Sequence, residues 1–256
     1  MSIAKTQAPP NSQRETDEIN SLVTPPLLVL SIVTAIAVAF GLWLALGYAG
    51  TDIEQGDVQR LFYVHVPSFF GAFVAFIAAV VGGVGYLRTR NLMWDRLALA
   101  GVEVGLMLSL VNLATGSIWA RPIWNTWWTW DSRLTSAAVM ALTYAAYLML
   151  RAGVENPEQR RRFAAVYGII AIVTALATLF IIRIDPTTIH PVAVGASPQN
   201  AEGTFELDAT RGVTTAILAN MPIWTLLVPM TLMWWRMRLE RINERVERMK
   251  AALLGS

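Results

Sequence analysis

The sequence contains no cysteine and only two histidines among its 256 residues. The absence of cysteine excludes disulfides, thiolate metal sites, covalent thioether attachment of a cofactor and cysteine nucleophiles. Two histidines limit nitrogen ligation of a metal to one site with at most two such ligands. Only 15% of the residues are charged, compared with about 25% in typical soluble domains. These scarcities disfavour a compact soluble enzyme, a disulfide scaffold and a nucleic-acid-binding module.

Long apolar runs occupy just over half of the chain. Six of them reach about 17 residues or more, the shortest length that crosses a bilayer core: 25–49, 61–87, 97–119, 134–150, 163–182 and 213–235. The longest segment between them, 183–212, is too short for a soluble domain, which needs roughly 50 residues. The sequence therefore predicts an all-α, polytopic membrane protein with six transmembrane helices.

The basic residues are distributed unequally between the two sides of these spans. One side, which includes both termini, carries 15 Lys and Arg, and the other side carries 5. The positive-inside rule therefore predicts that both termini are cytoplasmic. The predicted parts are a cytoplasmic N-terminal segment, 1–24, a membrane domain, 25–235, and a cytoplasmic basic amphipathic tail, 236–256. We expect the tail to be a helix that extends the last span, with charge pairs three or four residues apart.

Both histidines fall on the predicted outer side. His65 lies four residues inside the second span, just before Pro67, and His190 lies in the third outer loop between Pro186 and Pro191. A single histidine near the end of a span is usually a packed or hydrogen-bonded residue. The pair favours a joint site, because the only two histidines reach the same face from different segments.

Tryptophan is abundant, and five of its ten copies fall within twelve residues of the second outer loop: Trp119, Trp124, Trp127, Trp128 and Trp130. We expect a short amphipathic helix beginning at Pro122, with Trp124, Trp127, Trp128 and Asp131 on one face. Such a face is a shelf for a large, flat, apolar ligand. The structural alternative is an interfacial aromatic belt.

Two imidazoles, an aromatic shelf and nearby arginines together fit a haem, with guanidinium groups meeting its propionates. The possible propionate partners are Arg60, Arg121, Arg133 and Arg183. A lipid, a quinone or a carbohydrate on the tryptophans remains an alternative. Asp131 either orients an indole, attracts a partner or caps the following helix, and the capping or orienting role is preferred.

Glu103 is the one carboxylate well inside a span. It is either a functional intramembrane charge or a residue at a helix contact, neutral, hydrogen-bonded or reaching Arg96 or Arg88. We place it outside the outer site. Glycines in the second and third spans, such as Gly82 and Gly101, predict close packing of these two helices.

Four motifs then resemble one family: F-Y-V-H-V-P (62–67), T-G-S-I-W (115–119), W-N-T-W-W-T-W-D-S-R-L-T-S (124–136) and T-I-H-P (188–191). This set is similar to the haem exporter protein C family (CcmC) of cytochrome c maturation, and the segment 119–133 resembles its tryptophan-rich WWD signature. One departure is the stretch 183–188, which lacks the tryptophans that some members carry before the second histidine.

The resemblance implies a haem-delivery subunit of the bacterial inner membrane, with no catalytic residues. It implies that His65 and His190 are the axial ligands of a transported, non-covalent haem b. The implied platform comprises Trp119, Trp124, Trp127, Trp128, Trp130 and Asp131. The implied partners are a membrane-anchored periplasmic haem chaperone, ABC-type transporter subunits, a small single-span subunit and membrane lipids, but no nucleic acid.

The residues also allow two other functions. A bis-histidine electron-transfer subunit usually needs a second redox centre toward the inner side, and no histidine is left to hold one. A non-haem scaffold or permease, in which the tryptophans only anchor the bundle, predicts a protein purified without haem.

Overall fold

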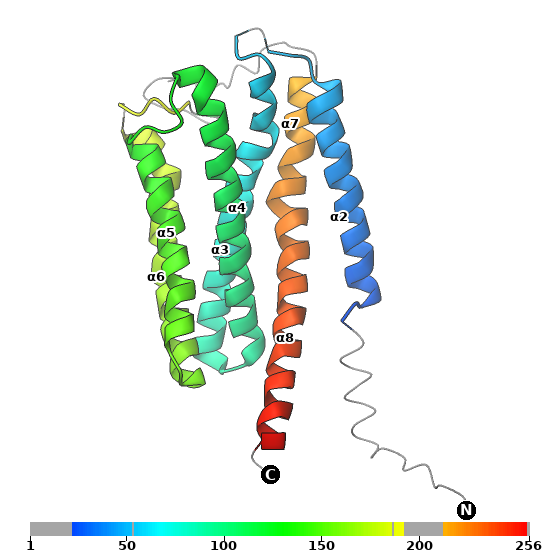
Figure 1. Cartoon of the computed structure of the whole chain (residues 1–256), viewed down its shortest axis with the longest axis vertical. Coiled ribbons are helices and arrows are strands. Elements are labelled where there is room, and N and C mark those ends of the chain that lie inside the picture. The colour runs from blue at the N-terminus through cyan, green and yellow to red at the C-terminus, as the bar shows by residue number, and fades with distance from the viewer. Residues whose placement is uncertain (1–21, 53, 186, 192–211, 255–256) are drawn as a thin grey trace, which may run out of the picture.

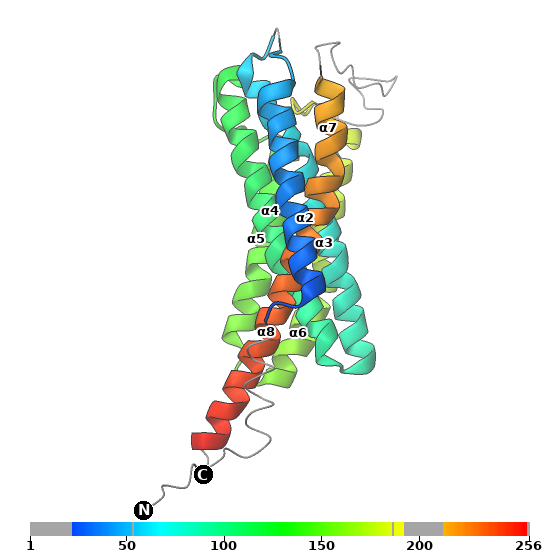
Figure 2. The ribbon, with the colours of Figure 1, turned by 90° about the vertical axis from the view of Figure 1, so that its right-hand side faces the viewer.

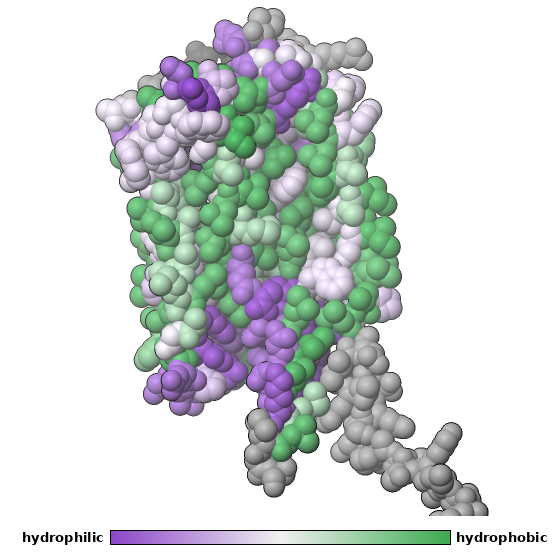
Figure 3. Space-filling view, viewed as in Figure 1, coloured by the Kyte–Doolittle hydropathy of each residue, from purple (hydrophilic) through white to green (hydrophobic). Residues whose placement is uncertain are grey.

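The computed structural model describes residues 22–52, 54–185, 187–191 and 212–254. These residues form a bundle of six helical segments that are long and apolar enough to cross a membrane, with no β-strand among them. The all-α fold with six spans is therefore confirmed. Hydrophobic residues cover the middle of the bundle, and hydrophilic residues gather at its two ends (Figure 3). Of the predicted N-terminal segment, residues 1–21 lie outside the described residues.

Several of the six spans combine an α-helix with a short π or 3-10 turn. The elements are α2 (Pro25–Trp43) with a π turn η1 (Leu44–Tyr48), a 3-10 turn η2 (Asp57–Leu61) followed by α3 (Phe62–Thr89), α4 (Leu92–Trp124), α5 (Ser132–Gly153), α6 (Pro157–Ile184), and α7 (Val213–Pro222) continuing through a π turn η3 (Ile223–Leu227) into α8 (Val228–Leu254). The start of α2 and the end of α8 lie at one end of the bundle (Figure 1).

Local sequence signals fix where the helices begin and end. The side chains of Asn91, Asp131 and Asn156 each accept a hydrogen bond from a backbone N–H in the first turn of the next helix. Such caps satisfy amide groups that have no partner inside the helix. The capping role predicted for Asp131 is confirmed, since its Oδ1 lies 2.8 Å from the Arg133 nitrogen and 3.0 Å from the Leu134 nitrogen.

Close packing of α3 on α4 is also confirmed. A Cβ atom added to Gly82 would lie 2.5 Å from the Ala98 nitrogen, and one added to Gly101 would lie 2.5 Å from the Ala75 carbonyl oxygen. Only glycine permits backbones to approach this closely. The two helices therefore form a rigid pair, and α3 and α4 supply much of the site described below.

The tryptophan-rich segment differs from the predicted separate helix. Pro122 lies in the last turn of α4, and residues 125–131 are not helical. The helix ends because Asn125 adopts a left-handed conformation, with φ of 56°, which asparagine tolerates better than most residues. Arg121 holds this turn by donating to the Asn125 carbonyl oxygen at 2.8 Å. Only seven residues then remain before α5, so the tryptophans are divided between a helix end and a loop.

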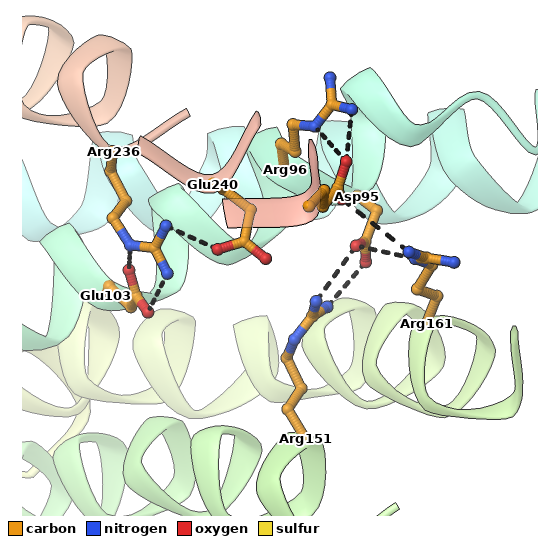
Figure 4. Close-up of polar contacts among 8 residues, drawn as sticks. Asp95, Arg96, Glu103, Arg151, Arg161, Arg236 and Glu240 are labelled. Carbon is orange, nitrogen blue, oxygen red and sulfur yellow. Dashed lines mark hydrogen bonds and ion pairs between the residues drawn. The ribbon is translucent and has the colours of Figure 1, made fainter. Parts of the chain in front are cut away.

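Ion pairs connect the helices toward the end of the bundle where α2 begins and α8 ends, opposite the tryptophan-rich segment (Figure 4). We call this the basic end. Asp95 of α4 is 2% exposed and accepts from Arg151 of α5 at 2.7 Å, while Arg161 of α6 lies 3.5 Å away. Arg96 pairs with Glu244 of α8 at 2.6 Å. These contacts fix four helices relative to one another at the basic end.

Glu103 belongs to the same set of ion pairs. Its partner is Arg236 of α8, whose Nη2 donates to Glu103 Oε1 at 3.1 Å and whose Nη1 donates to Glu240 at 2.9 Å. Glu103 thus lies at a helix contact, which was one of the alternatives. The suggested partners Arg96 and Arg88 were wrong, because α8 packs beside α4 and brings Arg236 within reach.

The predicted helical tail is confirmed as far as Leu254. Helix α8 continues without a break beyond the other helices (Figure 2). Two ion pairs have the predicted spacing, Arg236 with Glu240 and Glu247 with Lys250. Because Glu244 also pairs with Arg96 of α4, the first turns of the tail are attached to the bundle.

Candidate functional site

A pocket lies at the end of the bundle opposite the basic end, between α3, α4, α5 and the loops at this end. It encloses about 990 Å³ of empty space, a volume that includes the space open to solvent. Its lining is largely apolar, with a few polar groups. The lining residues central to the site are His65, His190, Trp119, Trp124, Trp128, Arg133, Phe69, Asn112, Gly116 and Gln55.

Helix α4 holds the His65 ring. The Nδ1 atom of His65 lies 3.0 Å from the Asn112 carbonyl oxygen and 3.2 Å from the Thr115 hydroxyl oxygen. The Asn112 side-chain nitrogen also lies 3.2 Å from Nδ1, and we assign its proton to the shorter bond, to the His65 carbonyl oxygen. Because a carbonyl can only accept, we assign the ring proton to Nδ1. That tautomer leaves the lone pair of Nε2 available to a metal, the usual arrangement of metal-binding histidines.

Two further contacts position His65. The Asn112 side-chain nitrogen donates to the His65 carbonyl oxygen at 2.8 Å. A Cβ atom on Gly116 would lie 2.9 Å from His65 Cε1, so the ring occupies space that any other residue would fill. Asn112, Thr115 and Gly116 are spaced three and four residues apart and therefore form one face of α4 against the imidazole.

His190 is held within its own short segment. Its Nδ1 lies 2.8 Å from the Pro191 carbonyl oxygen, and its backbone N–H donates to the Thr188 hydroxyl at 3.3 Å. Thr188 in turn donates to the Asp131 carboxylate at 3.3 Å. Burial lowers the pKa of His190 to about 3, and the nearby Arg133 cation acts in the same direction. His190 is therefore neutral at physiological pH, the form that binds metals.

The two histidine rings face one pocket, as the sequence predicted. Their centres are 6.2 Å apart and their planes are inclined by 32°. Two imidazoles bound to one iron from opposite sides, with metal–nitrogen bonds of about 2 Å, have ring centres roughly 6 Å apart. The donor type, the tautomers and the separation therefore fit a bis-histidine haem site.

The pocket separates the five clustered tryptophans into two groups. Trp119, Trp124 and Trp128 line it, and the first two are in edge contact, with centres 5.0 Å apart. Trp119 donates from its indole N–H to Gln55 at 2.8 Å. Trp127 and Trp130 are instead 58% and 79% exposed and are not among the lining residues. The predicted single face with Trp124, Trp127, Trp128 and Asp131 is therefore wrong, because the segment is not one helix.

The four candidate arginines also differ in position. Only Arg133 lines the pocket, with its guanidinium 4.6 Å from the centre of the Phe69 ring and a hydrogen bond to the Thr178 carbonyl. Arg60 donates to the carbonyl oxygens of Ala45, Leu46 and Ala49 and so fixes the η1 turn at the end of the first span. Arg121 is engaged with Asn125, and Arg183 is exposed and not among the lining residues.

Sequence reasoning did not select several of the residues that shape the site. Asn112 had a usable signal, since it is the one amide side chain inside the predicted span 97–119. Thr115 and Gly116 lie within the T-G-S-I-W motif (115–119), but no sequence pattern assigns either of them a role. Gln55 and Phe69 had no distinguishing signal, and only the fold brings them to the pocket.

Comparison with known proteins gives one family. The family model described as CcmC, Heme exporter protein C, matches residues 11–252. A Paracoccus denitrificans protein named Heme exporter protein C is 28% identical over 203 residues, 79% of each chain.

Other relatives match over shorter stretches. An Escherichia coli protein with the same name is 29% identical over 168 residues, which cover 60% of this chain and 67% of the relative. An Arabidopsis thaliana protein named putative cytochrome c biosynthesis ccmC-like mitochondrial protein is 36% identical over 110 residues. That match spans 43% of each chain, less than half of the plant relative.

Proposed function

Since this chain belongs to the haem exporter protein C family, we propose that it handles haem for cytochrome c biogenesis by binding it in the pocket between His65 and His190. The haem would be cargo, a non-covalent haem b, because the chain has no cysteine to attach it. The chain would act as a haem-delivery subunit and not as an enzyme.

The observation that carries this proposal is the geometry of the two histidines. Their ring centres are 6.2 Å apart, and each Nδ1 faces a carbonyl oxygen, so that both Nε2 atoms are available. Two imidazoles saturate the iron and block oxygen chemistry, which suits a carrier.

The remaining lining residues would hold the porphyrin. Trp119, Trp124 and Trp128 supply aromatic area for stacking. Arg133 is the candidate for a propionate, since a guanidinium binds a carboxylate through two parallel hydrogen bonds. Asp131 would act indirectly, because it caps α5 next to Arg133 and accepts from Thr188.

Delivery would occur at the outer face of the bacterial inner membrane. The excess of basic residues around the opposite end of the bundle supports a cytoplasmic position for both termini. The acceptor would be a membrane-anchored periplasmic haem chaperone. ABC-type transporter subunits and a small single-span subunit would complete the assembly. We assign the exposed Trp127 and Trp130, which are close in sequence to the pocket residue Trp128, to the surface that contacts the acceptor.

The alternative functions have less support. An electron-transfer subunit needs a second redox centre across a core of about 30 Å, and both histidines of the chain are already in one pocket. A scaffold in which the tryptophans only anchor the bundle does not account for three of them lining a pocket together with both histidines.

Purification in mild detergent tests the proposal. We expect the full chain, produced with ample haem, to carry haem with a low-spin visible spectrum. His65→Ala and His190→Ala should each lose that spectrum. A colourless wild-type protein would overturn the haem-carrier function, and unchanged low-spin spectra in both variants would overturn the ligand assignment.

A further inference from the structure

We propose that the two histidines hold haem unequally: His65 is the fixed ligand, and His190 is the ligand that dissociates to open the iron for transfer. This inference rests on the proposed bis-histidine function. It adds an order of events and names Asn112, Thr115 and Thr188 as positioning residues.

His65 is restrained by a neighbouring helix at both its ring and its backbone. Its Nδ1 lies within 3.2 Å of Asn112 and Thr115, and its carbonyl oxygen accepts from the Asn112 side chain at 2.8 Å. The Ser68 hydroxyl donates to the same carbonyl at 2.9 Å. Helix α4 therefore opposes withdrawal of the ring from the pocket.

The helix that carries His65 is packed tightly on α4. His65 lies in the first turns of α3, and farther along the same helix an added Cβ on Gly101 would meet Ala79 and Ala75 backbone atoms. Packed helices move as rigid units, so the His65 backbone stays in place unless α3 separates from α4, and the ring alone can leave only by breaking its hydrogen bond to α4.

The contacts of His190 are of a different kind. Within the described part of the chain, the one hydrogen bond of its ring is to the carbonyl of the next residue, Pro191. Its backbone is tied to the body of the protein through Thr188, by two hydrogen bonds of 3.3 Å, the second to Asp131. The described residues around it, 187–191, are not helical.

This difference predicts which iron bond breaks first. Withdrawal of His190 requires rotation of a loop residue and the loss of its hydrogen bonds. Withdrawal of His65 requires either the separation of two packed helices or rotation of the ring out of its contacts with Asn112 and Thr115 of α4. The bond between iron and His190 Nε2 would therefore break, with the lone pair remaining on the imidazole. The face of the iron that opens would be the one covered by residues 187–191, next to Trp124, whose ring centre is 6.4 Å from that of His190.

Carbon monoxide can identify the ligand that leaves, because it binds ferrous haem by replacing one axial ligand. The experiment uses the full chain in detergent, loaded with haem and reduced, and records the C–O stretching frequency and the visible spectrum. We expect the wild-type adduct to match that of His190→Ala, in which carbon monoxide must occupy the same face. The His65→Ala adduct should differ, because its carbon monoxide lies beside the Asn112 and Thr115 side chains.

The rate of carbon monoxide binding tests the positioning residues. Thr188→Val removes the two hydrogen bonds that link His190 to Asp131 in series. It should accelerate binding at least fivefold, about the effect of losing one neutral hydrogen bond. Thr115→Val and Asn112→Ala should leave this rate within about twofold, because His65 stays bound in the limiting step. The matched control is Thr143→Val on α5. The Thr143 hydroxyl donates to the Val139 carbonyl of the same helix, so this variant should leave the rate unchanged.

The outcomes separate this inference from the proposed function. A wild-type adduct that matches His65→Ala, or faster binding in Thr115→Val and not in Thr188→Val, would overturn the assigned order. If instead neither histidine variant changes the spectrum of the bound haem, the bis-histidine site itself is wrong. Asn220→Ala serves as a folding control for Asn112→Ala, since Asn220 is also buried and hydrogen-bonded but lies between α7 and α2.

Discussion

Gly116 offers the most direct test of the site geometry. A Cβ atom at this position would lie 2.9 Å from His65 Cε1 and 3.4 Å from Nδ1. Carbon atoms in contact are normally about 3.5–4.0 Å apart, so Gly116→Ala must displace the imidazole by roughly 0.6 Å. The displacement is directed away from α4, where the Asn112 carbonyl accepts the Nδ1 proton at 3.0 Å.

The size of the effect follows from the tolerance of a coordinated ligand. Binding constellations must be held within about 0.5 Å of their productive geometry, and a misplacement of about 1 Å costs about a hundredfold. We therefore expect the dissociation constant for haem to rise about tenfold to a hundredfold, about 1.4–2.8 kcal/mol. Alanine favours a helix over glycine by roughly 0.5–1 kcal/mol, so the loss of affinity would not come from a weakened α4.

The assay is titration of the haem-free full chain with haem in detergent, followed by the Soret band, alongside thermal melting of the haem-free protein. Gly153→Ala is the matched control, because no described heavy atom lies within 4 Å of its added Cβ. We expect the control to bind haem as the wild type does. Wild-type affinity and a low-spin spectrum in Gly116→Ala would show that the ring of His65 is not the ligand in this position.

Three further outcomes are expected. Arg133→Gln should weaken haem binding about tenfold, the effect of losing one charged hydrogen bond. Arg121→Gln should leave binding unchanged, because Arg121 is engaged with Asn125 outside the pocket. Equal losses of affinity in the two variants would contradict the role of Arg133. Replacing Trp124 and Trp128 together by alanine should reduce the haem retained after gel filtration, whereas alanine at the exposed Trp127 and Trp130 should leave it within about twofold of wild type. Asp95→Asn should lower the free energy of unfolding in a denaturant titration by about 3–5 kcal/mol, since it removes the carboxylate that pairs with the largely buried Arg151. Asp57→Asn, in an exposed pair, should cost less than about 1 kcal/mol.

Several features of the fold follow from local sequence rules. The lengths of the apolar runs predict six spans, because the thickness of a bilayer core sets the length of a helix that crosses it. Caps such as Asp131 and Asn156 mark helix starts for a similar reason, since a short oxygen-bearing side chain satisfies free amides. The alternation of arginine and glutamate predicts the helical tail. None of these features depends on distant parts of the chain.

The tryptophan segment shows where extrapolation from spacing failed. A helical periodicity counted from Pro122 holds only if the helix continues, and Asn125 ends it by adopting a positive φ angle. The directions in which the Trp127 and Trp128 side chains point are then set by the loop conformation and not by helical periodicity. The four candidate arginines could not be ranked from sequence either, because their contacts involve residues far away along the chain.

The sequence by itself determined the membrane class, the number of spans and the shared side of the two histidines, because these follow from run lengths, charge and the alternation of spans. Only the tertiary structure decided that Asn112, Thr115 and Gly116 position His65, that Arg133 alone of the four arginines lines the pocket, and that His190 is held by its own segment. The physical reason is distance along the chain. The contacts of His65 join residues 47 and 50 positions apart, and their geometry arises only when α3 and α4 pack.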